Sequence, residues 1–175
     1  MNQRLEKPDF CVEVQTEQEY AAFGTLLEKY DRAFDLKKRY ENAPGSVRAF
    51  YAIDAAGHPF AALALYEHDP WNRTVSISCI SVNGNETEKL IAAIQWVTGI
   101  AVLEMGAEKV CTLIGKDSEE YASFFLSAGY SYDGFLRDHL LLSNGQRSDA
   151  FLISILKHEY ERQHFLHCKL VKDVI

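Results

Sequence analysis

The chain has 175 residues, 47% of them hydrophobic and 25% charged, with a formal net charge of −7 and a pI near 5.4. These values are typical of a single domain with its own apolar core, which we expect over residues 1–175, with the core at about 10–160 and a tail at 161–175. The acidic balance argues against a nucleic-acid partner, and the lack of a long apolar run argues against a membrane span or a signal segment.

The four cysteines, Cys11, Cys79, Cys111 and Cys168, are scattered and form no C-x-x-C pair. Cys79 and Cys111 lie in apolar runs, where a free cysteine behaves as a small hydrophobic residue. This usage fits a reducing compartment, so we expect a cytoplasmic protein.

The chain begins with a predicted strand at residues 10–15, followed by a capping box formed by Thr16 and Glu19. Large apolar residues then recur at helical spacing: Tyr20, Phe23, Leu27, Tyr30 and Phe34. The predicted helical region ends before the breaker at residues 42–45.

Three strand patterns follow, at residues 46–54, 59–69 and 74–82. The first two are joined by a hairpin turn around Gly57 and the last two by the short loop at residues 70–73. Consecutive strands with short connections predict an antiparallel meander.

The pattern then changes to a helix, with apolar residues every three or four positions from Leu90 to Met105 and a glycine stop at Gly106. The apolar run at 109–115 is typical of a strand buried on both faces. A right-handed crossover would place this strand parallel to strand 74–82.

A second capping box, Asp117 with Glu120, predicts another helix that ends at Gly129. Strand patterns at 130–143 and 147–156 flank an Asn-Gly turn, which is a strong hairpin signal. The sequence therefore predicts a mixed α/β fold: one mixed sheet of about seven strands with helices on both faces.

This element order and the C-terminal pattern resemble the GNAT N-acetyltransferase superfamily, particularly the branch that acetylates protein N-termini. The residues that carry the resemblance are Gly129-Tyr130, Gly134, Leu136-Arg137, Gly145, Asp149 and the apolar strand 151–156. The topology matches over residues 10–160, and the motifs match over the last third of that range.

The resemblance implies direct transfer of an acetyl group from acetyl-CoA, as co-substrate, to a primary amine of a small molecule or a peptide. It also implies that the central parallel strands splay and that the pantetheine arm pairs with the backbone of Ile80, Ser81 and Val82. The pyrophosphate would lie at Gly84 and Asn85, because a helix N-terminus favours anions. On the second helix, Ser118 and Phe125 hold the positions of cofactor-contacting residues.

The stretch SVNGNETEKL departs from the family loop, because it keeps only Gly84. Glu86 and Glu88 fall in the first helical turn, where carboxylates compete with a diphosphate. Asn85 with Glu88 would make a capping box, so the alternative to a degenerate pyrophosphate loop is a capped helix start.

Three residues are candidates for acid–base catalysis. Glu67 and His68 end the second meander strand, and the alternative for both is a solvated loop. At the position of Phe125, family members often carry a tyrosine that protonates the thiolate. Tyr121 lies one helical turn before this position. Packing in the core is the alternative role for Tyr121.

Arg137 and Asp149 are the candidate substrate contacts, because the family hairpin borders the acceptor site. An ion pair between the two across the strands is the alternative. The pattern H-x-x-H-C at residues 164–168 has metal-binding side chains without a partner elsewhere, so we expect no metal site. The alternative overall function is a GNAT-like domain without catalysis, acting as a ligand-binding or protein-interaction module. A homodimer is the assembly that we consider for the chain.

Overall fold

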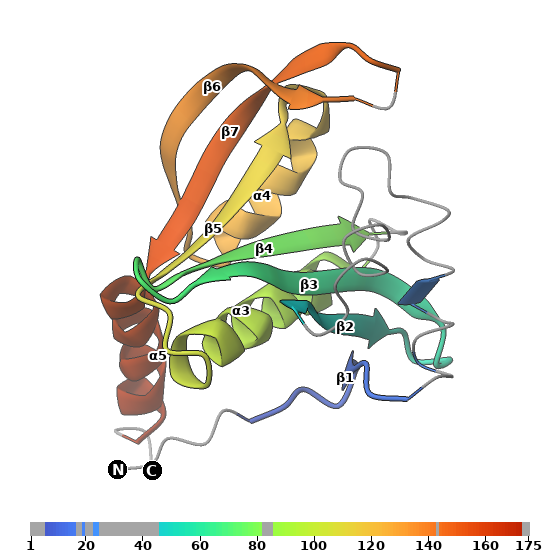
Figure 1. Ribbon diagram of the computed structural model, residues 1–175. Helices are drawn as coiled ribbons and strands as arrows, with labels where there is room; N and C mark the ends of the chain where they lie inside the picture. Colours follow the sequence, from blue (N-terminus) through green and yellow to red (C-terminus); the bar gives the residue numbers. More distant parts are fainter. Residues whose placement is uncertain are drawn as a thin grey trace.

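The computed structural model describes residues 6–16, 19, 23–24, 46–81, 86–142 and 144–172, with side chains as far as residue 164. In this part of the chain seven strands form one sheet in the order β1-β2-β3-β4-β5-β7-β6 (Figure 1). The strands are β1 (Cys11–Glu13), β2 (Arg48–Ile53), β3 (Pro59–Asp69), β4 (Thr74–Ser81), β5 (Lys109–Gly115), β6 (Ser131–Leu141) and β7 (Arg147–Leu156). The helices described over at least two turns are α3 (Thr87–Leu103), α4 (Glu119–Ser127) and α5 (Lys157–Lys172).

The first four strands form the predicted antiparallel meander. The turn between β2 and β3 closes with a hydrogen bond from Asp54 N to His58 O, and Gly57 adopts φ 82° there. Glycine tolerates this left-handed backbone, so the hairpin prediction is confirmed. The capping box is also confirmed, because Thr16 N donates to Glu19 Oε2 (2.8 Å) and Glu19 N donates to Thr16 Oγ1 (3.3 Å).

Helix α3 carries the chain from β4 to β5, and the two strands run parallel, as predicted. Its apolar side packs on the sheet with residues such as Leu65, Ile77 and Val110 in the larger hydrophobic cluster. Ala122 and Phe125 of α4 belong to the same cluster, so α3 and α4 cover the same face of the sheet. A smaller cluster lies on the opposite face.

The segment between β5 and the β6–β7 hairpin differs from its prediction in one respect. Helix α4 begins after Ser118, and no side-chain hydrogen bond caps it, so the predicted capping box of Asp117 with Glu120 is wrong. A 3-10 turn (Lys116–Ser118) takes up these residues instead. Gly129 ends α4 with φ 100°, and Gln163 Nε2 of α5 donates to Gly129 O (3.2 Å).

Several predictions fall outside the described residues. The first predicted helix is described only at Glu19, Phe23 and Gly24, and the expected helices on the second face of the sheet lie in the same segment.

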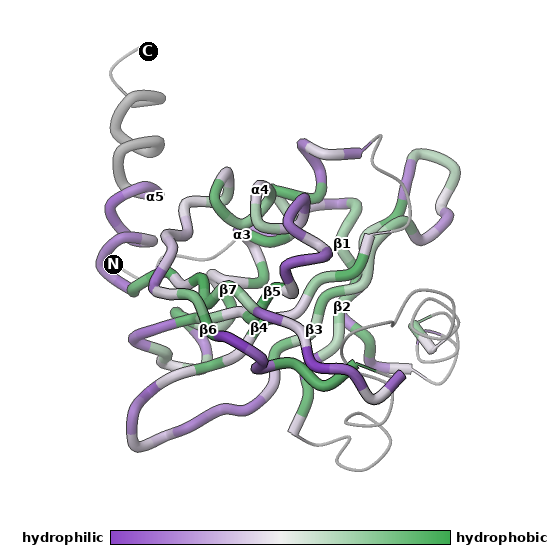
Figure 2. Tube along the Cα trace, turned by 90° about the horizontal axis from the view of Figure 1, so that it is seen from above, coloured by the Kyte–Doolittle hydropathy of each residue, from purple (hydrophilic) through white to green (hydrophobic). Residues whose placement is uncertain are grey.

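In Figure 2 the hydrophobic stretches gather along the strands and the helices that cover them, whereas the described start of α5 is mainly hydrophilic. No described helix is long and apolar enough to cross a membrane.

Removal of two buried tyrosine hydroxyls is expected to change the free energy of unfolding in opposite directions. Tyr130 Oη lies 2.6 Å from Thr98 Oγ1, whereas Tyr160 Oη has no hydrogen-bond partner among the described residues. A buried polar group without a partner costs about 1–3 kcal/mol. We therefore expect Tyr160→Phe to leave the free energy of unfolding unchanged or raise it by about 1 kcal/mol.

The matched change Tyr130→Phe should lower the free energy of unfolding by about 1 kcal/mol, because it removes the buried hydrogen bond between Tyr130 Oη and Thr98 Oγ1, whereas Thr98 keeps its own donation to Ile94 O. Urea unfolding of both variants measures the two effects on the same scale. Equal losses in both variants would show that the Tyr160 hydroxyl has a partner in solution.

Candidate active site

The centre of the sheet contains a fork between β4 and β5. The parallel pairing runs only from Thr74 opposite Lys109 to Ser76 opposite Cys111, although both strands continue beyond this pair. Beyond it β4 stays with β3 and β5 stays with β7, and the two strands diverge in Figure 1. We call the pair of Ser76 and Cys111 the branch point, and the space between the strands beyond it the fork.

One side of β4 turns its backbone groups towards the fork. Ser81 N donates to Tyr121 Oη (3.2 Å), and Tyr121 Oη donates to Ser81 O (3.1 Å), so both backbone groups of Ser81 point away from β3. Backbone direction alternates along an antiparallel strand. The N–H and C=O groups of Ile77 and Cys79 therefore also face the fork, and those of Ile80 face β3.

Tyr121 reaches this position from α4, which follows the open end of β5 after the 3-10 turn at Lys116–Ser118. Its ring also packs edge-on against Phe124, with the centroids 5.9 Å apart. Partial burial of the phenol raises its pKa above the ordinary value of 10, so the hydroxyl keeps its proton at neutral pH. The phenol therefore both donates and accepts at the open end of the fork.

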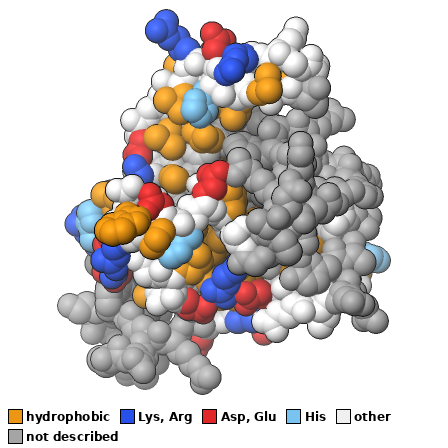
Figure 3. All heavy atoms as spheres, viewed as in Figure 1, with side chains coloured by type: hydrophobic (Ala, Val, Ile, Leu, Met, Phe, Trp, Pro, Cys, Tyr) orange, Lys and Arg blue, Asp and Glu red, His pale blue; other side chains and the backbone are white. Residues whose placement is uncertain are grey.

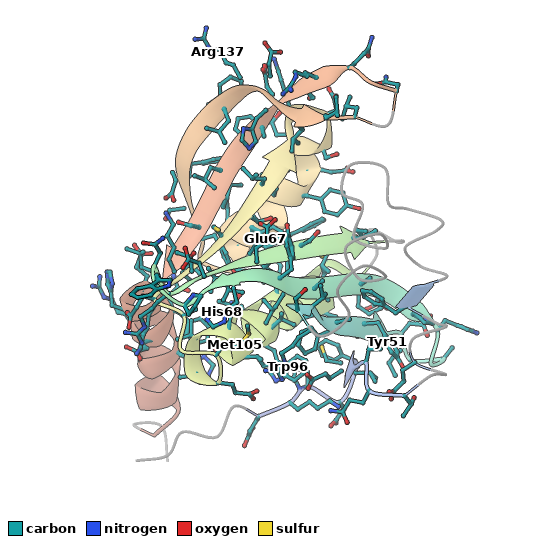
Figure 4. All side chains as sticks on the ribbon, viewed as in Figure 1. Tyr51, Glu67, His68, Trp96, Met105 and Arg137 are labelled. Atoms are coloured by element: carbon teal, nitrogen blue, oxygen red, sulfur yellow. The ribbon has the colours of Figure 1, made fainter. Side chains whose placement is uncertain are left out.

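Glu67 lies at the branch point because β3 is irregular there. Tyr66 pairs with Ser76 and Asp69 pairs with Thr74, so an additional residue bulges out of β3. Glu67 takes φ 52° in this bulge. Its Oε2 accepts a hydrogen bond from Ser76 Oγ (3.2 Å), which places the carboxylate on the face of the sheet opposite α3 and α4. Figure 4 shows Glu67 over the middle of the sheet.

Cys111 completes the branch point. Its Sγ lies 3.9 Å from Ser76 Oγ and 3.7 Å from Val75 O. Burial raises the pKa of the Cys111 thiol, so the thiolate, which is the nucleophilic form, is scarce at neutral pH. The site is therefore unsuited to a covalent acyl-cysteine intermediate.

The N-terminus of α3 lies at the open end of β4, as predicted, but much of the intervening loop is outside the described residues. Val82, Gly84 and Asn85 belong to that part, so their predicted contacts are not placed. No side-chain hydrogen bond caps α3 at Glu86, whose carboxylate instead forms an ion pair with Lys89 (2.9 Å). The start of α3 thus places two carboxylates, Glu86 at the N-cap and Glu88 in the first turn, beside its backbone N–H groups.

Three other predicted site residues are described by the structure: Ser118, Phe125 and His68. Ser118 is half-buried at the start of α4, whereas the Phe125 ring is 1% exposed and packs edge-on against Tyr130. His68 is exposed and lies towards the α5 end of the sheet in Figure 4.

The predicted substrate residues lie on the β6–β7 hairpin. Asp149 Oδ1 accepts a hydrogen bond from Asp138 N (3.0 Å) rather than pairing with Arg137. Arg137 is exposed at the far end of this hairpin, away from Glu67 (Figure 4).

Sequence reasoning did not assign Ser76 or Cys111 to the site. The strand sequence TVSISCIS carries small polar side chains at alternate positions, which indicates one face that is not covered by an apolar element. Only the register shows that Ser76, Glu67 and Cys111 meet, because they come from three different strands.

Comparison with solved structures identifies the fold. Spermidine N-acetyltransferase from Vibrio cholerae, in complex with CoA and spermine, superposes with a TM-score of 0.70 at 14% identity, over 87% of this chain and 99% of that one. A structure of glutamate-to-glutamine mutant forms of the spermidine/spermine N-acetyltransferase from Vibrio cholerae gives a TM-score of 0.72 at 13% identity, over 90% of this chain and 99% of that one. A chimera of the Vibrio cholerae enzyme with hSSAT gives 0.70 at 14%, over 86% and 98%.

The chain has the GNAT fold. No protein-family model matches it, and neither does any curated protein sequence. The fold class and the splayed central strand pair that the sequence predicted are therefore confirmed. The three structures are spermidine acetyltransferases, so the resemblance to the branch that acetylates protein N-termini remains a prediction.

Proposed function

We propose that this chain is an N-acetyltransferase that moves an acetyl group directly from acetyl-CoA to a primary amine. The observation that carries the proposal is the fork, where β4 and β5 part beyond the Ser76–Cys111 pair. A parted strand offers backbone donors and acceptors that an extended ligand can pair with, as an added strand would. The neighbour crystallised with CoA and spermine supports both the carrier and an amine acceptor.

The carrier would lie along β4 with its diphosphate at the start of α3. Ile77 and Cys79 turn their backbone groups towards its pantetheine arm, and the first N–H groups of α3 favour the phosphates. Ile80 takes no part in this backbone pairing, and the buried Phe125 is left out of the proposed contacts. Val82, Gly84, Asn85 and Ser118 stay in the proposed carrier site.

Tyr121 belongs to the carrier arm in this arrangement and not to proton transfer. Its hydroxyl binds Ser81, which is five residues along β4 from Ser76. At about 3.3 Å per residue this separation is roughly 16 Å. A thioester at the branch point is therefore beyond the direct reach of the phenol, which instead lines the pantetheine.

Glu67 is the proposed general base. It takes a proton from the attacking ammonium group, directly or through a water, and the neutral amine attacks the thioester carbonyl carbon. The carbon–sulfur bond then breaks, the electron pair leaves with sulfur as the CoA thiolate, and the nitrogen gives its second proton to solvent to become the neutral amide. An ordinary thiol has a pKa of about 8.5, so this thiolate leaves without a dedicated acid and takes a proton from solvent.

Acetyl-CoA binding and turnover test this function. A ligand at about 100 times its Kd stabilises the native state by about 2.7 kcal/mol, which corresponds to a rise in Tm of roughly 5–10 °C for a chain of this size. Thiol release from acetyl-CoA in the presence of an amine measures the transfer. No Tm shift at millimolar acetyl-CoA would remove the transferase proposal.

The two glutamates at the start of α3 should weaken carrier binding. Glu86→Gln/Glu88→Gln removes two negative charges near the proposed diphosphate, each of which acts with about 0.3–1 kcal/mol at a helix terminus. We expect the affinity for acetyl-CoA to rise about threefold to thirtyfold, as measured by calorimetry at low salt.

A matched double variant controls for net charge. Glu108→Gln/Glu161→Gln removes two charges beyond the C-terminal end of α3 and on α5, and the affinity should stay within about twofold of the parent. An equal rise in both variants would show that the effect is general electrostatics and not a diphosphate at α3.

One observation favours the alternative function, a GNAT-like domain that binds without catalysis. The Tyr121 phenol occupies both backbone groups of Ser81, which a pantetheine arm would otherwise approach. Acetyl-CoA binding without thiol release, across a wide range of amines, would support this alternative.

The unpaired cysteines Cys11, Cys79 and Cys111 fit a reducing compartment, and we propose a cytoplasmic location.

A further inference from the structure

Four polar residues are buried in the described part of the chain: Ser78, Thr98, Thr112 and Ser154. The hydroxyls of Thr98 and Ser154 form hydrogen bonds of 2.6 and 2.7 Å. The hydroxyls of Ser78 and Thr112 have no hydrogen-bond partner among the described residues. Native proteins pair almost all of their buried polar groups, so these two hydroxyls are candidates for contacts with a ligand.

Both residues lie directly beyond the branch point. Thr112 follows Cys111 on β5, and Ser78 is two residues beyond Ser76 on β4. Among the described residues, the fully buried side-chain oxygen without a partner is Tyr160 Oη, so the Ser78 and Thr112 oxygens keep some accessible surface. Each residue is nevertheless more than nine-tenths buried. Because β4 and β5 part at this level, we place the accessible surface of both oxygens in the fork.

The two hydroxyls are on opposite faces of the sheet. Ser78 pairs with Ala64 of β3, which belongs to the smaller hydrophobic cluster, on the face opposite α3 and α4. Thr112 pairs with Ile153 of β7, which belongs to the larger cluster beneath these helices. Side chains of residues paired across strands share a face. Ser78 is therefore on the face that carries Glu67, and Thr112 is on the face that α3 and α4 cover.

The proposed function brings one reactant to the fork from each face. The carrier places its diphosphate at the start of α3 and its arm beside Tyr121, so it reaches the fork on the helix side. The amine has to meet the proposed base, Glu67, so it reaches the fork on the other side. Each unpartnered hydroxyl thus lies on the path of a different reactant.

The surroundings of Ser78 favour a hydrogen bond to the amine. Leu113 and Leu152 pair on this face, and Figure 3 shows hydrophobic side chains over β5 and β7 here. An amine that moves next to such a surface loses contacts with water, and a protein hydroxyl can replace one of them. Ser76 is on the same face roughly 7 Å away along β4, but its hydroxyl already donates to Glu67 (3.2 Å).

We propose that Ser78 binds the acceptor amine by accepting a hydrogen bond from its nitrogen, and that Thr112 binds the carrier arm from the opposite face. The inference rests on the proposed transferase function, because that function supplies both reactants. Of the three protons on the ammonium group, one goes to the base, one goes to solvent and one stays in the amide. Ser78 Oγ accepts the N–H that stays, which turns the nitrogen lone pair towards the thioester carbon.

Ser78→Ala removes the acceptor of this hydrogen bond. Thiol release at saturating acetyl-CoA is measured with spermidine and with phenethylamine, and kcat/KM should fall about tenfold or more for both, because the contact is with the nitrogen. The Tm of the free protein should be unchanged or higher, because the hydroxyl has no partner there. Ser78→Thr keeps the hydroxyl, and its kcat/KM should stay within about threefold of that of the parent protein.

A structural role for the Ser78 hydroxyl predicts a different result. Loss of kcat/KM together with a fall in Tm in Ser78→Ala would assign the hydroxyl to the fold and overturn the inference. An equal loss of kcat/KM in Ser78→Thr would also overturn it, because the hydroxyl is still present in that variant.

Thr112→Val is the complementary variant on the helix face. It should raise the Kd of acetyl-CoA about tenfold, as measured by calorimetry, and leave the KM of both amines within about twofold. Ser123→Ala removes an exposed hydroxyl from α4 and is the matched control, which should change neither quantity. Weaker acetyl-CoA binding in Ser78→Ala, or a higher amine KM in Thr112→Val, would overturn the assignment of the two faces.

The parent protein separates this inference from the function on which it rests. Normal turnover in Ser78→Ala would overturn the inference and leave the transferase function standing. No thiol release by the parent protein with either amine would overturn the inference as well. If acetyl-CoA then also failed to shift the Tm, the proposed function would be defeated together with it.

Discussion

Glu67→Gln is expected to lower kcat by about a hundredfold, the ordinary size of a general-base contribution. Glutamine has the same shape and can still accept the hydrogen bond from Ser76 Oγ. It also inherits the same φ of 52°, so the strain of the bulge is equal in both proteins. The free energy of unfolding and the Tm shift with acetyl-CoA should therefore be unchanged, and thiol-release assays should show the loss in turnover alone.

His68→Asn is the matched control for this prediction. His68 is the neighbouring residue in the same bulge and is exposed like Glu67, but it lies towards the α5 end of the sheet (Figure 4). The kcat of the His68→Asn variant should stay within about twofold of that of the parent protein. A large loss in the His68 variant with a normal Glu67 variant would transfer the role of base to the histidine.

The second large effect comes from two prolines at neighbouring positions of β4. Ile80→Pro should lower the free energy of unfolding by about 3 kcal/mol, because the Ile80 N–H faces β3 and proline removes that donor from the ladder. Cys79→Pro should cost less, because the Cys79 N–H faces the fork, where β5 no longer pairs with β4.

Cys79→Pro should instead weaken acetyl-CoA binding about tenfold or more, because the lost donor is one that the pantetheine arm would use. Chemical unfolding and calorimetry separate the two effects. Unchanged affinity in a folded Cys79→Pro protein would mean that the carrier does not pair with this stretch of β4.

The sequence predicted the elements well because local patterns determine them. The bounds 59–69, 109–115 and 147–156 are the same in prediction and structure, and the predicted turns lie at Gly57 and Gly145, both with φ 82°. The capping box at Asp117 failed because its residues entered a 3-10 turn, which has a different hydrogen-bond pattern. The parallel pair followed from the crossover rule, and its divergence followed from the family resemblance.

The site was predicted less completely, for a physical reason. Ile80, Ser81 and Val82 were chosen by position along the strand, but the direction of each backbone group depends on the register with β3, which sequence spacing alone does not specify. Tyr121 was a candidate catalyst, and only its contact with Ser81 shows how far its hydroxyl lies from the branch point.

Periodicity, glycine placement and the crossover rule let the sequence by itself determine the strands, the helices and the mixed sheet, since these depend on neighbouring residues. The tertiary structure alone decided that Glu67, Ser76 and Cys111 converge and that Leu113 and Leu152 line the same face. These contacts join residues far apart in the chain, and a bulge of one residue or a shift of register would separate them.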